Sequence, residues 1–478
     1  MDVHPFLINN QWTTGGAKPI VSINPADGSE VATVGRADKS DVEAAIAAAR
    51  AALRNPAWRD LKPHERAKYL HRMGDLLSAD AERIARLQTK DNGKTIRETR
   101  GQVASAANTF RYFAAVCETF ESHVTPSRGN YWTMTVYEPV GVVSTIAPWN
   151  SPITLEAQKL APALAAGNTV VHKPSSTTPM MALEFARIAV EAKLPPGVLN
   201  VVIGSSEVGD VMVEHPDVRM VSFTGGTEVG RRLAEICGRR LIPSSMELGG
   251  KSPHIVFADA DLKKAIASTG DGIFSGAGQS CVAGSRIFVE QSVYKDYLAG
   301  LKAFAEAYRI GAPDDEATDM GPLASFSHRE TVESYVELGR QDGAQLVAGG
   351  SRPKGGLFDK GAYYAATILT GVDNKARVAR EEIFGPVAVV IPFKDEADLI
   401  AQANDTPYGL ASGVWTSDYP KAWRVARALE AGTVWINTYK QLSITTPFGG
   451  FKESGMGREK GYHSILHYMQ EKGIYWGL

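Results

Sequence analysis

Four short apolar runs decide the fold: VGVVSTIAP (140–148), NTVVHKP (168–174), VLNVVIG (198–204) and VRMVSFTGG (218–226). Segments with helical patterning follow them in turn, at 153–165, 178–192, 206–213 and 227–237. Strands that alternate with helices favour a parallel sheet that is wound on both faces. Such sheets carry nucleotides at the C-terminal ends of their strands. We therefore expect an α/β nucleotide-binding domain around these runs.

A second α/β domain is expected in residues 250–445. That region repeats the alternation of strand-like and helical segments less regularly, with the strand-like runs PHIVFADA, SRIFVE, VAVVIPF and GTVWIN. Residues 40–120 have helical patterning instead. Ser40 and Glu43 have the S-x-x-E spacing of a capping box, and Pro63 suits the first turn of another helix.

Bulk composition excludes several functional classes. The chain has 478 residues, a formal net charge of −2 and 44% hydrophobic residues. This length favours two or three subdomains. The balanced charge does not indicate binding to nucleic acid or to an anionic membrane. No run approaches the roughly 18 apolar residues of a membrane span. The start, MDVHPFLINNQW, lacks the pattern of a signal peptide.

The cysteines are Cys117, Cys237 and Cys281. Their odd number and the absence of a C-x-x-C pattern favour neither a disulfide framework nor a metal site, so we expect no metal and a reducing cytoplasm. Cys117, in FAAVCETF, is expected to pack in a core. Cys281 lies in GAGQSCVAGSR (276–286), among residues too small to pack tightly against sulfur. That segment leaves room beside a thiol.

Three further stretches each have a functional and a structural interpretation. FTGGTEVG (223–230) is a strand-to-helix turn that suits a phosphate, or a plain connection. Glu247, at the end of a predicted strand, is a desolvated base or a salt-bridged side chain. Asn150 is an oxyanion donor or a turn former. No histidine lies near Cys281 in the sequence, so a cysteine protease would depend on contacts made by the fold.

The order of the motifs is more specific than any one of them. They are PWN (148–150), KPS (173–175), FTGGTEVG, ELGGKSP (247–253), GQSC (278–281), EEIFGPV (381–387) and PFGGFKESGMGRE (447–459). In this order the chain resembles the aldehyde dehydrogenase superfamily over almost its whole length, in its NAD(P)-dependent, hydrolytic branch. The presence of Glu247 favours that branch over the CoA-acylating one.

The resemblance implies two doubly wound α/β domains, a Rossmann-like cofactor domain and a catalytic domain, plus a small β oligomerisation extension. The implied NAD(P)-binding domain covers 1–117 and 138–249, the catalytic domain 250–445, and the bridging segments 118–137 and 446–478. Because the family forms dimers and dimers of dimers through such segments, we expect a homodimer or homotetramer. The apolar tail IYWGL then packs on a partner subunit, although packing on its own chain is the alternative.

The resemblance also implies the catalytic roles. Cys281 would attack the aldehyde to give a thiohemiacetal and later a thioester, and Asn150 with the Cys281 N–H would hold the oxyanion. Glu247 would activate the hydrolytic water, and Lys159 would lie near the site. A free thiol has a pKa of about 8.5, so it needs a base or positive surroundings at neutral pH.

Cofactor residues carry over in the same way. Lys173 would bind the adenosine ribose and Glu382 the nicotinamide ribose. The remaining residues of the implied NAD(P) site are Trp149, Thr224, Gly225, Gly226, Gly230, Leu248 and Phe384. Ser176 replaces the glutamate of K-P-x-E that many NAD-preferring members have, so we expect NADP to be at least tolerated. Gly226 replaces a common serine and predicts lower cofactor affinity.

The substrate tunnel is implied to be lined by Ser151, Leu155, Gln158, Ser280 and Val282, and closed by 438–446. This lining lacks an aromatic wall, which predicts a roomier pocket for an aromatic or medium-chain aldehyde. Two alternatives remain. One is a cysteine hydrolase or acyltransferase without a redox cofactor, and the other is a non-catalytic binding protein of the same fold.

Overall fold

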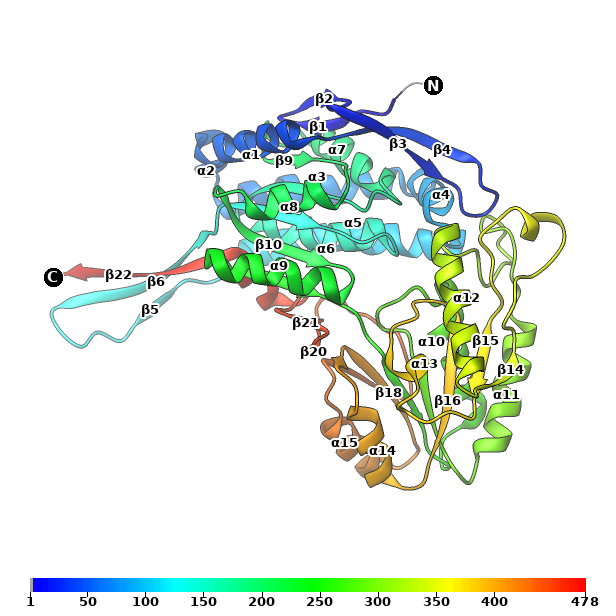
Figure 1. Ribbon diagram of the computed structural model, residues 1–478. Coiled ribbons are helices and arrows are strands. Elements are labelled where there is room, and N and C mark those ends of the chain that lie inside the picture. Colours follow the sequence, from blue (N-terminus) through cyan, green and yellow to red (C-terminus); the bar gives the residue numbers. More distant parts are fainter. Residues whose placement is uncertain (1–2) are drawn as a thin grey trace.

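The four apolar runs form neighbouring strands of one sheet in the computed structural model, which describes residues 3–478 (Figure 1). The runs form β7 (Val142–Ile146), β8 (Thr169–Lys173), β9 (Leu199–Val201) and β10 (Val218–Thr224), and a fifth strand, β11 (Ser244–Glu247), lies beside β10. They are parallel in the order β11-β10-β7-β8-β9, and β21 (Gly455–Met456) adds an antiparallel strand beside β11. Both faces of this sheet are buried, as its apolar runs predict.

The helices between these strands are α6 (Pro152–Ala165), α7 (Met180–Glu191), α8 (Ser206–Glu214) and α9 (Thr227–Arg240). The chain steps from β7 to β8 to β9 in one direction, then returns to β10 and β11. Since such crossovers are right-handed, α6 and α7 cover one face and α8 and α9 the other. The predicted doubly wound α/β architecture is therefore confirmed. Its strand order reverses between β7 and β10, where ligands bind at the strand ends.

The N-terminal region precedes this sheet. Its elements are β1 (Phe6–Ile8), β2 (Gln11–Thr13), β3 (Ala17–Ile23), β4 (Glu30–Arg36), α1 (Lys39–Arg54), α2 (Pro56–Arg59), α3 (Pro63–Ala79), α4 (Ala81–Asn92) and α5 (Ile96–Thr119). Pro63 opens α3, as predicted. Cys117 is buried on α5 and its Sγ lies 3.2 Å from the carbonyl oxygen of Ala165, which confirms core packing.

The predicted capping box of Ser40 and Glu43 is wrong. Asp38 is the N-cap of α1: its carboxylate accepts the Asp41 N–H at 3.1 Å, and the Asp41 carboxylate accepts the Asp38 N–H at 3.0 Å. Ser40 already lies inside the helix. An aspartate caps as well as a serine does, so the box formed two residues earlier, where Asp41 also accepts the N–H of Gly16 at 2.9 Å.

Residues after 250 build a second sheet in the order β14-β15-β16-β13-β12-β18-β19. Its strands are β12 (Pro253–Val256), β13 (Arg286–Glu290), β14 (Gln345–Ala348), β15 (Thr367–Thr370), β16 (Val387–Phe393), β18 (Ala411–Trp415) and β19 (Thr433–Ile436). All pairs are parallel except β14 with β15. Its apolar core is separate from that of the first sheet. The predicted second α/β domain is thus confirmed.

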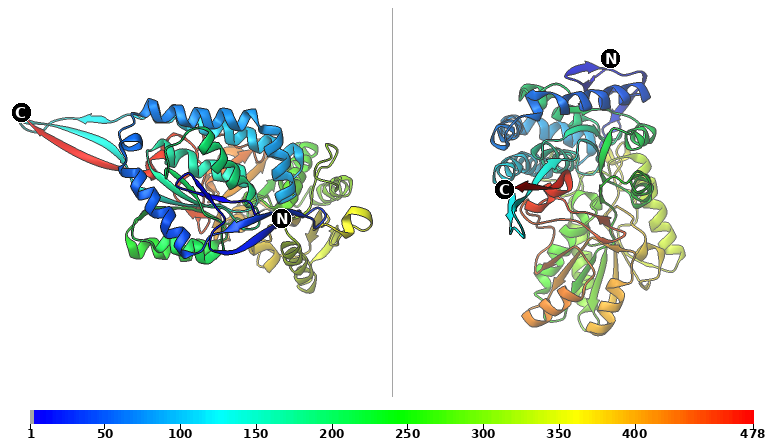
Figure 2. Two further views of the ribbon diagram at one scale, coloured as in Figure 1. Left: turned by 90° about the horizontal axis from the view of Figure 1, so that it is seen from above. Right: turned by 90° about the vertical axis from the view of Figure 1, so that its left-hand side faces the viewer.

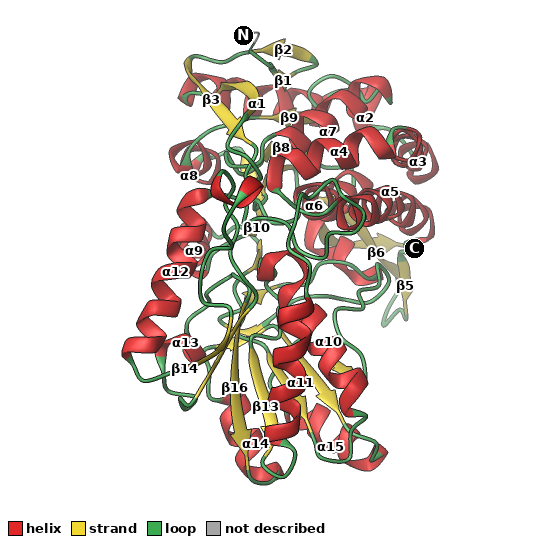
Figure 3. Cartoon of the chain, turned by 90° about the vertical axis from the view of Figure 1, so that its right-hand side faces the viewer, coloured by secondary structure: helices red, strands yellow, loops and turns green. Residues whose placement is uncertain are grey.

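Helices flank the second sheet, as Figure 3 shows for α11, α12 and α15. The helices and short elements between residues 262 and 468 are α10 (Leu262–Phe274), η1 (Ser275–Gly278), α11 (Tyr294–Ala307), α12 (Phe326–Gln341), η2 (Gly356–Asp359), α13 (Arg377–Arg380), α14 (Glu396–Asn404), β17 (Tyr408–Gly409), α15 (Tyr419–Ala428), β20 (Phe451–Lys452) and η3 (Tyr462–Tyr468). The last of these, η3, packs on the core of the first sheet. Within residues 3–478, no helix combines the length and apolar composition needed to cross a membrane.

A third sheet stands away from the body and carries the C-terminus (Figures 1 and 2). It consists of β5 (His123–Thr125), β6 (Tyr131–Pro139) and β22 (Met469–Gly477), in the order β22-β6-β5. β22 pairs antiparallel with β6 along its whole length, from Met469 opposite Pro139 to Gly477 opposite Tyr131. The tail therefore finds its backbone partner in its own chain, while Tyr475 and Trp476 remain 74% and 66% exposed.

The predicted domain boundaries stay a prediction. The chain passes from the first sheet to the second between β11 and β12, and β21 returns from the segment 446–478 to the edge of the first sheet. The first two residues of the predicted 1–117 segment lie outside the described residues.

Candidate active site

A cavity of about 620 Å³ lies where the C-terminal ends of β7, β10 and β11 face the second sheet. It is lined by Pro148, Trp149, Asn150, Leu155, Thr224, Gly225, Gly226, Leu248, Gly249, Cys281, His328, Glu382 and Phe384. Ten of the predicted site residues thus meet in one place, although they come from loops far apart in the sequence.

The loop that presents Cys281 is shaped by its small residues. Gly276, Ala277 and Gly278 have φ values of 63°, 55° and 70°, in the left-handed region. A Cβ on Gly278 would lie 2.0 Å from the carbonyl oxygen of Gly385, so only glycine fits there. The positive φ of Ala277 is backbone strain of the kind that collects at functional sites. The turn brings the partly exposed Cys281 beside the segment that carries Glu382 and Phe384.

The electrostatic environment of Cys281 favours the protonated thiol. Burial raises the pKa of the Cys281 thiol to about 12, and the negative charges of Glu382 and Glu247 add to that increase. A thiol in this state is a poor nucleophile at neutral pH. The site therefore needs a group that can accept the thiol proton.

Glu247 is such a group. It ends β11, it is buried, and neither carboxylate oxygen has a hydrogen-bond partner within the described chain. Burial raises the pKa of Glu247 well above 4.5; the neighbouring Glu459 adds to this, and Lys159 opposes it. A carboxylate with a raised pKa is a usable base near neutral pH.

Lys159 lies behind Glu247 and is bound to Glu459. Its Nζ lies 2.6 Å from Glu459 Oε1 and 3.3 Å from Ser222 Oγ, and all three side chains are buried. Sequence reasoning missed Glu459, although it closes the motif PFGGFKESGMGRE. Nothing in the motif indicated that a residue 300 positions away would neutralise Lys159.

Asn150 is oriented by the cysteine loop itself. Its Nδ2 donates to the carbonyl oxygen of Gln279 at 3.0 Å, two residues before Cys281. The Gln279 side chain is fixed in turn, since it donates to the Gly276 carbonyl at 3.0 Å and accepts the Ala324 N–H at 2.8 Å. An amide held this way can donate to an oxyanion that forms beside the thiol.

Glu382, Phe384 and His328 form the opposite wall. Glu382 Oε1 accepts the Gly250 N–H at 3.0 Å, and burial raises the pKa of Glu382 to about 7. The Phe384 and Trp149 rings meet edge to face at 5.2 Å. His328, which sequence reasoning missed, packs on Trp149 at 5.0 Å and its Nε2 lies 2.7 Å from the Phe384 carbonyl oxygen. That hydrogen bond fixes the orientation of the imidazole ring.

A second cavity of about 820 Å³ adjoins the first and shares Pro148, Trp149, Thr224, Gly225 and Gly226 with it. It extends past Lys173 and Ser176 to Asp210 and Arg232. The N-terminus of α9 opens onto it at Gly226, whose N-cap position has no side-chain cap and no atom within 4 Å of where a Cβ would stand. Uncapped N–H groups at a helix N-terminus suit a phosphate. Burial lowers the pKa of Lys173 to about 8.

Several predicted residues do not line the thiol cavity. A Cβ on Gly230 would lie 2.3 Å from Leu248, so this glycine permits close helix packing. Four of the predicted substrate-pocket residues are also absent from its lining, namely Ser151, Gln158, Ser280 and Val282. Their predicted contact with substrate stays a prediction.

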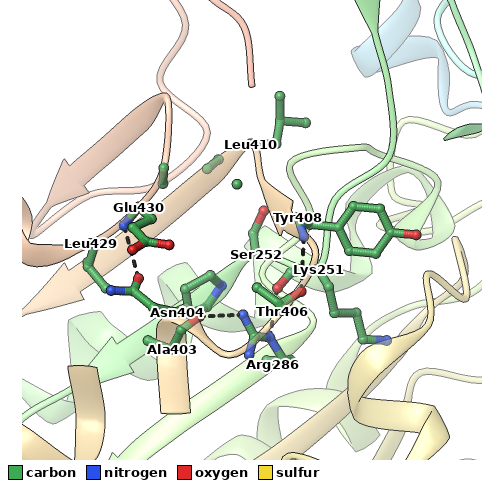
Figure 4. Close-up of a pocket in the computed structure, with 14 residues that line it drawn as sticks. Lys251, Ser252, Arg286, Ala403, Asn404, Thr406, Tyr408, Leu410, Leu429 and Glu430 are labelled. Carbon is green, nitrogen blue, oxygen red and sulfur yellow. Dashed lines mark hydrogen bonds between the residues drawn. The ribbon is translucent and has the colours of Figure 1, made fainter. Parts of the chain in front are cut away.

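A further small cavity surrounds Lys251 and Arg286 and contains none of the predicted site residues (Figure 4). The buried Arg286 donates to the carbonyl oxygens of Lys251 and Ala403, both at 2.8 Å, and to Asn374 Oδ1 at 2.9 Å. Figure 4 shows the Lys251 ammonium group directed away from that guanidinium. We assign this arginine a structural role, because backbone acceptors satisfy it.

Comparison with known proteins places the chain in one group. The model of the "Aldehyde dehydrogenase family" matches residues 12–474. The chain is 40% identical to phenylacetaldehyde dehydrogenase of Pseudomonas fluorescens, covering 98% of this chain and 95% of that protein. It is 44% identical to betaine aldehyde dehydrogenase of Mesorhizobium japonicum, covering 96% and 93%. The NAD⁺ complex of an aldehyde dehydrogenase from Bacillus cereus superposes with a TM-score of 0.97 at 37% identity, covering 100% and 97%.

The raised pKa of Cys281 predicts the effect of removing a neighbouring charge. Glu382→Gln is expected to speed alkylation of Cys281 by iodoacetamide at pH 8 by roughly three- to tenfold, because each unit of lowered thiol pKa gives about ten times more thiolate. Mass spectrometry of the peptide containing Cys281 measures the rate. The control is Glu381→Gln, whose carboxylate pairs with Arg377 at 2.7 Å. An unchanged or slower rate in Glu382→Gln contradicts the prediction.

Proposed function

Because this chain belongs to the aldehyde dehydrogenase family, we propose that it oxidises an aldehyde to the carboxylic acid through a thioester on Cys281. The observation that carries this proposal is the convergence of Cys281, Asn150 and Glu382 on one cavity, with the unpartnered carboxylate of Glu247 close enough to influence the thiol. A thiol, an amide donor and a desolvated carboxylate supply a nucleophile, an oxyanion partner and a base. A cysteine hydrolase would pair the thiol with a histidine, and His328, which lines this cavity, forms no hydrogen bond with Cys281 within residues 3–478.

Addition to the aldehyde is the first step that these residues support. Glu247 accepts the proton of Cys281, and the thiolate sulfur forms a bond to the carbonyl carbon. The electron pair of the C=O bond moves to the oxygen, where the Asn150 amide and the Cys281 N–H donate to it. Asn150 can turn from the Gln279 carbonyl to this oxyanion with little reorganisation, since its position is fixed by the same loop.

Oxidation and hydrolysis complete the reaction. The nicotinamide cofactor supplies, when bound, an acceptor for the two electrons and the hydrogen that leave the substrate carbon. A thioester then remains on Cys281. After Glu247 has released the thiol proton to solvent, it removes a proton from water, the water oxygen bonds to the acyl carbon, and the carbon–sulfur bond breaks to release the acid and regenerate the thiolate. The Lys159–Glu459 pair balances charge around Glu247 throughout.

The two adjoining cavities fit a dinucleotide. Lys173 and Ser176 would hold the adenosine ribose, and the uncapped N-terminus of α9 at Gly226 would face the pyrophosphate. Thr224 lines both cavities. Glu382, which faces the thiol cavity, would hold the nicotinamide ribose. The Bacillus cereus enzyme named above was solved with NAD⁺, which supports NAD as a cofactor here.

Replacing the proposed base tests the mechanism. Glu247→Gln is expected to lower kcat by roughly 100-fold or more, because a positioned general base contributes about that much. The burst of reduced cofactor should also become slower, because Glu247 accepts the Cys281 proton before the thioester can form. In the wild type, kcat should fall as pH decreases through the raised pKa of Glu247, well above 4.5, where the carboxyl group becomes protonated.

The matched control for that experiment is Glu235→Gln, on the exposed face of α9. Stopped-flow absorbance at 340 nm separates the burst from the steady state. Intact steady-state turnover of Glu247→Gln with water as acceptor would show that another group is the deacylation base.

Ser176 determines the expected cofactor selectivity. A serine can donate to a 2′-phosphate, whereas a glutamate would repel it, so kcat/KM for NADP is expected within a hundredfold of that for NAD. Ser176→Glu should lower kcat/KM for NADP by at least tenfold while NAD turnover serves as the internal control. Arg232 lines the same cavity but is paired with Asp210 at 2.9 Å, which limits its help to a phosphate. A wild-type preference for NAD above a hundredfold would refute the prediction.

We also propose a homo-oligomer formed through the projecting sheet. Trp476 lies opposite Trp132, and both are more than half exposed, at 66% and 56%. The outer edge of β22 has no strand partner within residues 3–478. Exposed aromatic groups on an open edge strand are typical of a surface that a partner covers.

Sedimentation velocity tests this interface. The wild type is expected to be a dimer or tetramer, and Trp476→Lys should shift it toward the monomer, because a buried lysine would lose its hydration. The control is Trp423→Lys, at a tryptophan that is 57% exposed on α15. A monomeric wild type, or an unchanged Trp476→Lys, would disprove the proposed interface.

The three free cysteines support a reducing cytoplasm as the compartment.

A further inference from the structure

We propose that the substrate is an aldehyde that also carries a carboxylate, and that the ammonium group of Lys440 recognises this carboxylate with help from Lys94. The inference deepens the proposed function and rests on it. It comes from charged side chains that gather on the turn leading to Cys281, outside every motif that identified the family.

Lys440 is held beside the cysteine loop. It lies in the loop 438–446 after β19, and its Nζ donates to Ser275 Oγ at 3.1 Å. The preceding residue, Tyr439, donates its hydroxyl to the carbonyl oxygen of Val282 at 2.9 Å. The loop is thus anchored on both sides of Cys281 in the sequence. Lys440 also has a φ of 55°, which is backbone strain at a non-glycine residue.

Lys94 approaches the same turn from the N-terminus of α5. Its side chain is almost fully buried, and its Nζ lies 2.4 Å from where a Cβ on Gly276 would stand. The missing side chain at Gly276 therefore leaves room for an ammonium group. The two lysines meet the turn at consecutive residues, Ser275 and Gly276.

Two carboxylates accompany these lysines but are not paired with them. Glu98 caps α5, where its Oε2 accepts the Thr95 N–H at 3.0 Å, and Asp271 accepts the Tyr308 hydroxyl at 3.3 Å. Within residues 3–478 the only hydrogen bond from the Lys440 ammonium group is the one to Ser275. An ammonium group has three donors, so Lys440 keeps hydrogen atoms for a further acceptor.

Lys440 also interacts electrostatically with the Cys281 thiol. Burial and the like charge of Lys94 lower the pKa of Lys440 to about 8, and negative charge at Glu98, Cys281 and Asp271 opposes that shift. Lys440 and Cys281 are therefore within electrostatic range of each other. A carboxylate bound between the lysines would favour their charged forms.

Polar side chains continue along α5 beyond Glu98. Gln102, on the same face of α5 as Glu98, donates to Ser151 Oγ at 3.2 Å, and Thr154 donates to the Gln102 carbonyl at 3.3 Å. The two lysines disfavour a cationic aldehyde. Among aldehydes, the anionic class satisfies the donors that the protein leaves unused.

Matched substrate pairs test this inference. The pairs are 4-formylbenzoate with 4-formylbenzamide, and 6-oxohexanoate with 6-oxohexanamide, assayed by reduction of NAD and NADP. The wild type is expected to prefer the carboxylate member by roughly 10- to 100-fold in kcat/KM, as for a hydrogen bond to a charged group. Lys440→Gln should bring that ratio close to one, mainly through KM. Lys440→Arg should retain most of the preference, and Lys375→Gln, on an exposed loop, should leave it unchanged.

The outcomes separate the two proposals. A wild type that oxidises the amides, or an added trimethylammonium aldehyde, as well as the carboxylates overturns the anionic substrate and leaves the proposed function standing. A preference that persists in Lys440→Gln, or an equal loss for both members of a pair, overturns the role of Lys440. Failure to oxidise any member of the panel, with either cofactor, counts against the proposed function itself.

Discussion

The close approach of Gly278 to the Gly385 carbonyl is the constraint on which the site depends. No side chain can stand at 278, because its Cβ would lie 2.0 Å from that oxygen. The contact fixes the cysteine loop against the segment that carries Glu382 and Phe384. The same loop, through the Gln279 carbonyl, orients Asn150 from the first sheet at 3.0 Å. One backbone contact thus determines where the thiol meets groups from both sheets.

Burial determines the protonation of the groups that this contact brings together. Cys281, Glu247 and Glu382 all have raised pKa values, and desolvation is the largest cause for each. The negative charges of Glu382 and Glu247 also raise the pKa of Cys281. A thiol that stays protonated at rest is protected from oxidation and alkylation. In the proposed mechanism it becomes a nucleophile when Glu247 accepts its proton.

The sequence predicted the two sheets because buried parallel strands give continuous apolar runs bounded by turns. It also placed Trp149, Thr224 and Glu247 at strand ends, as the ends of β7, β10 and β11 show. The predicted capping box was wrong because Asp38 and Ser40 are both good N-cap residues, and the helix uses Asp38. Glu459 and His328 were missed for a different reason. Their partners are 300 and 56 residues away, and no local pattern reports such contacts.

The chemistry and the choice of substrate are encoded in different parts of the chain. Cys281, Asn150 and Glu247 lie in motifs, and the fold holds them through backbone contacts that tolerate few side chains. Lys440 lies in the 438–446 loop, outside those motifs. Relatives at about 40% identity are named for phenylacetaldehyde and for betaine aldehyde, one neutral and one cationic. With Lys440 in its proposed role, the charge that selects the substrate comes from this loop, so substrate class can change while the reaction at the thiol stays the same.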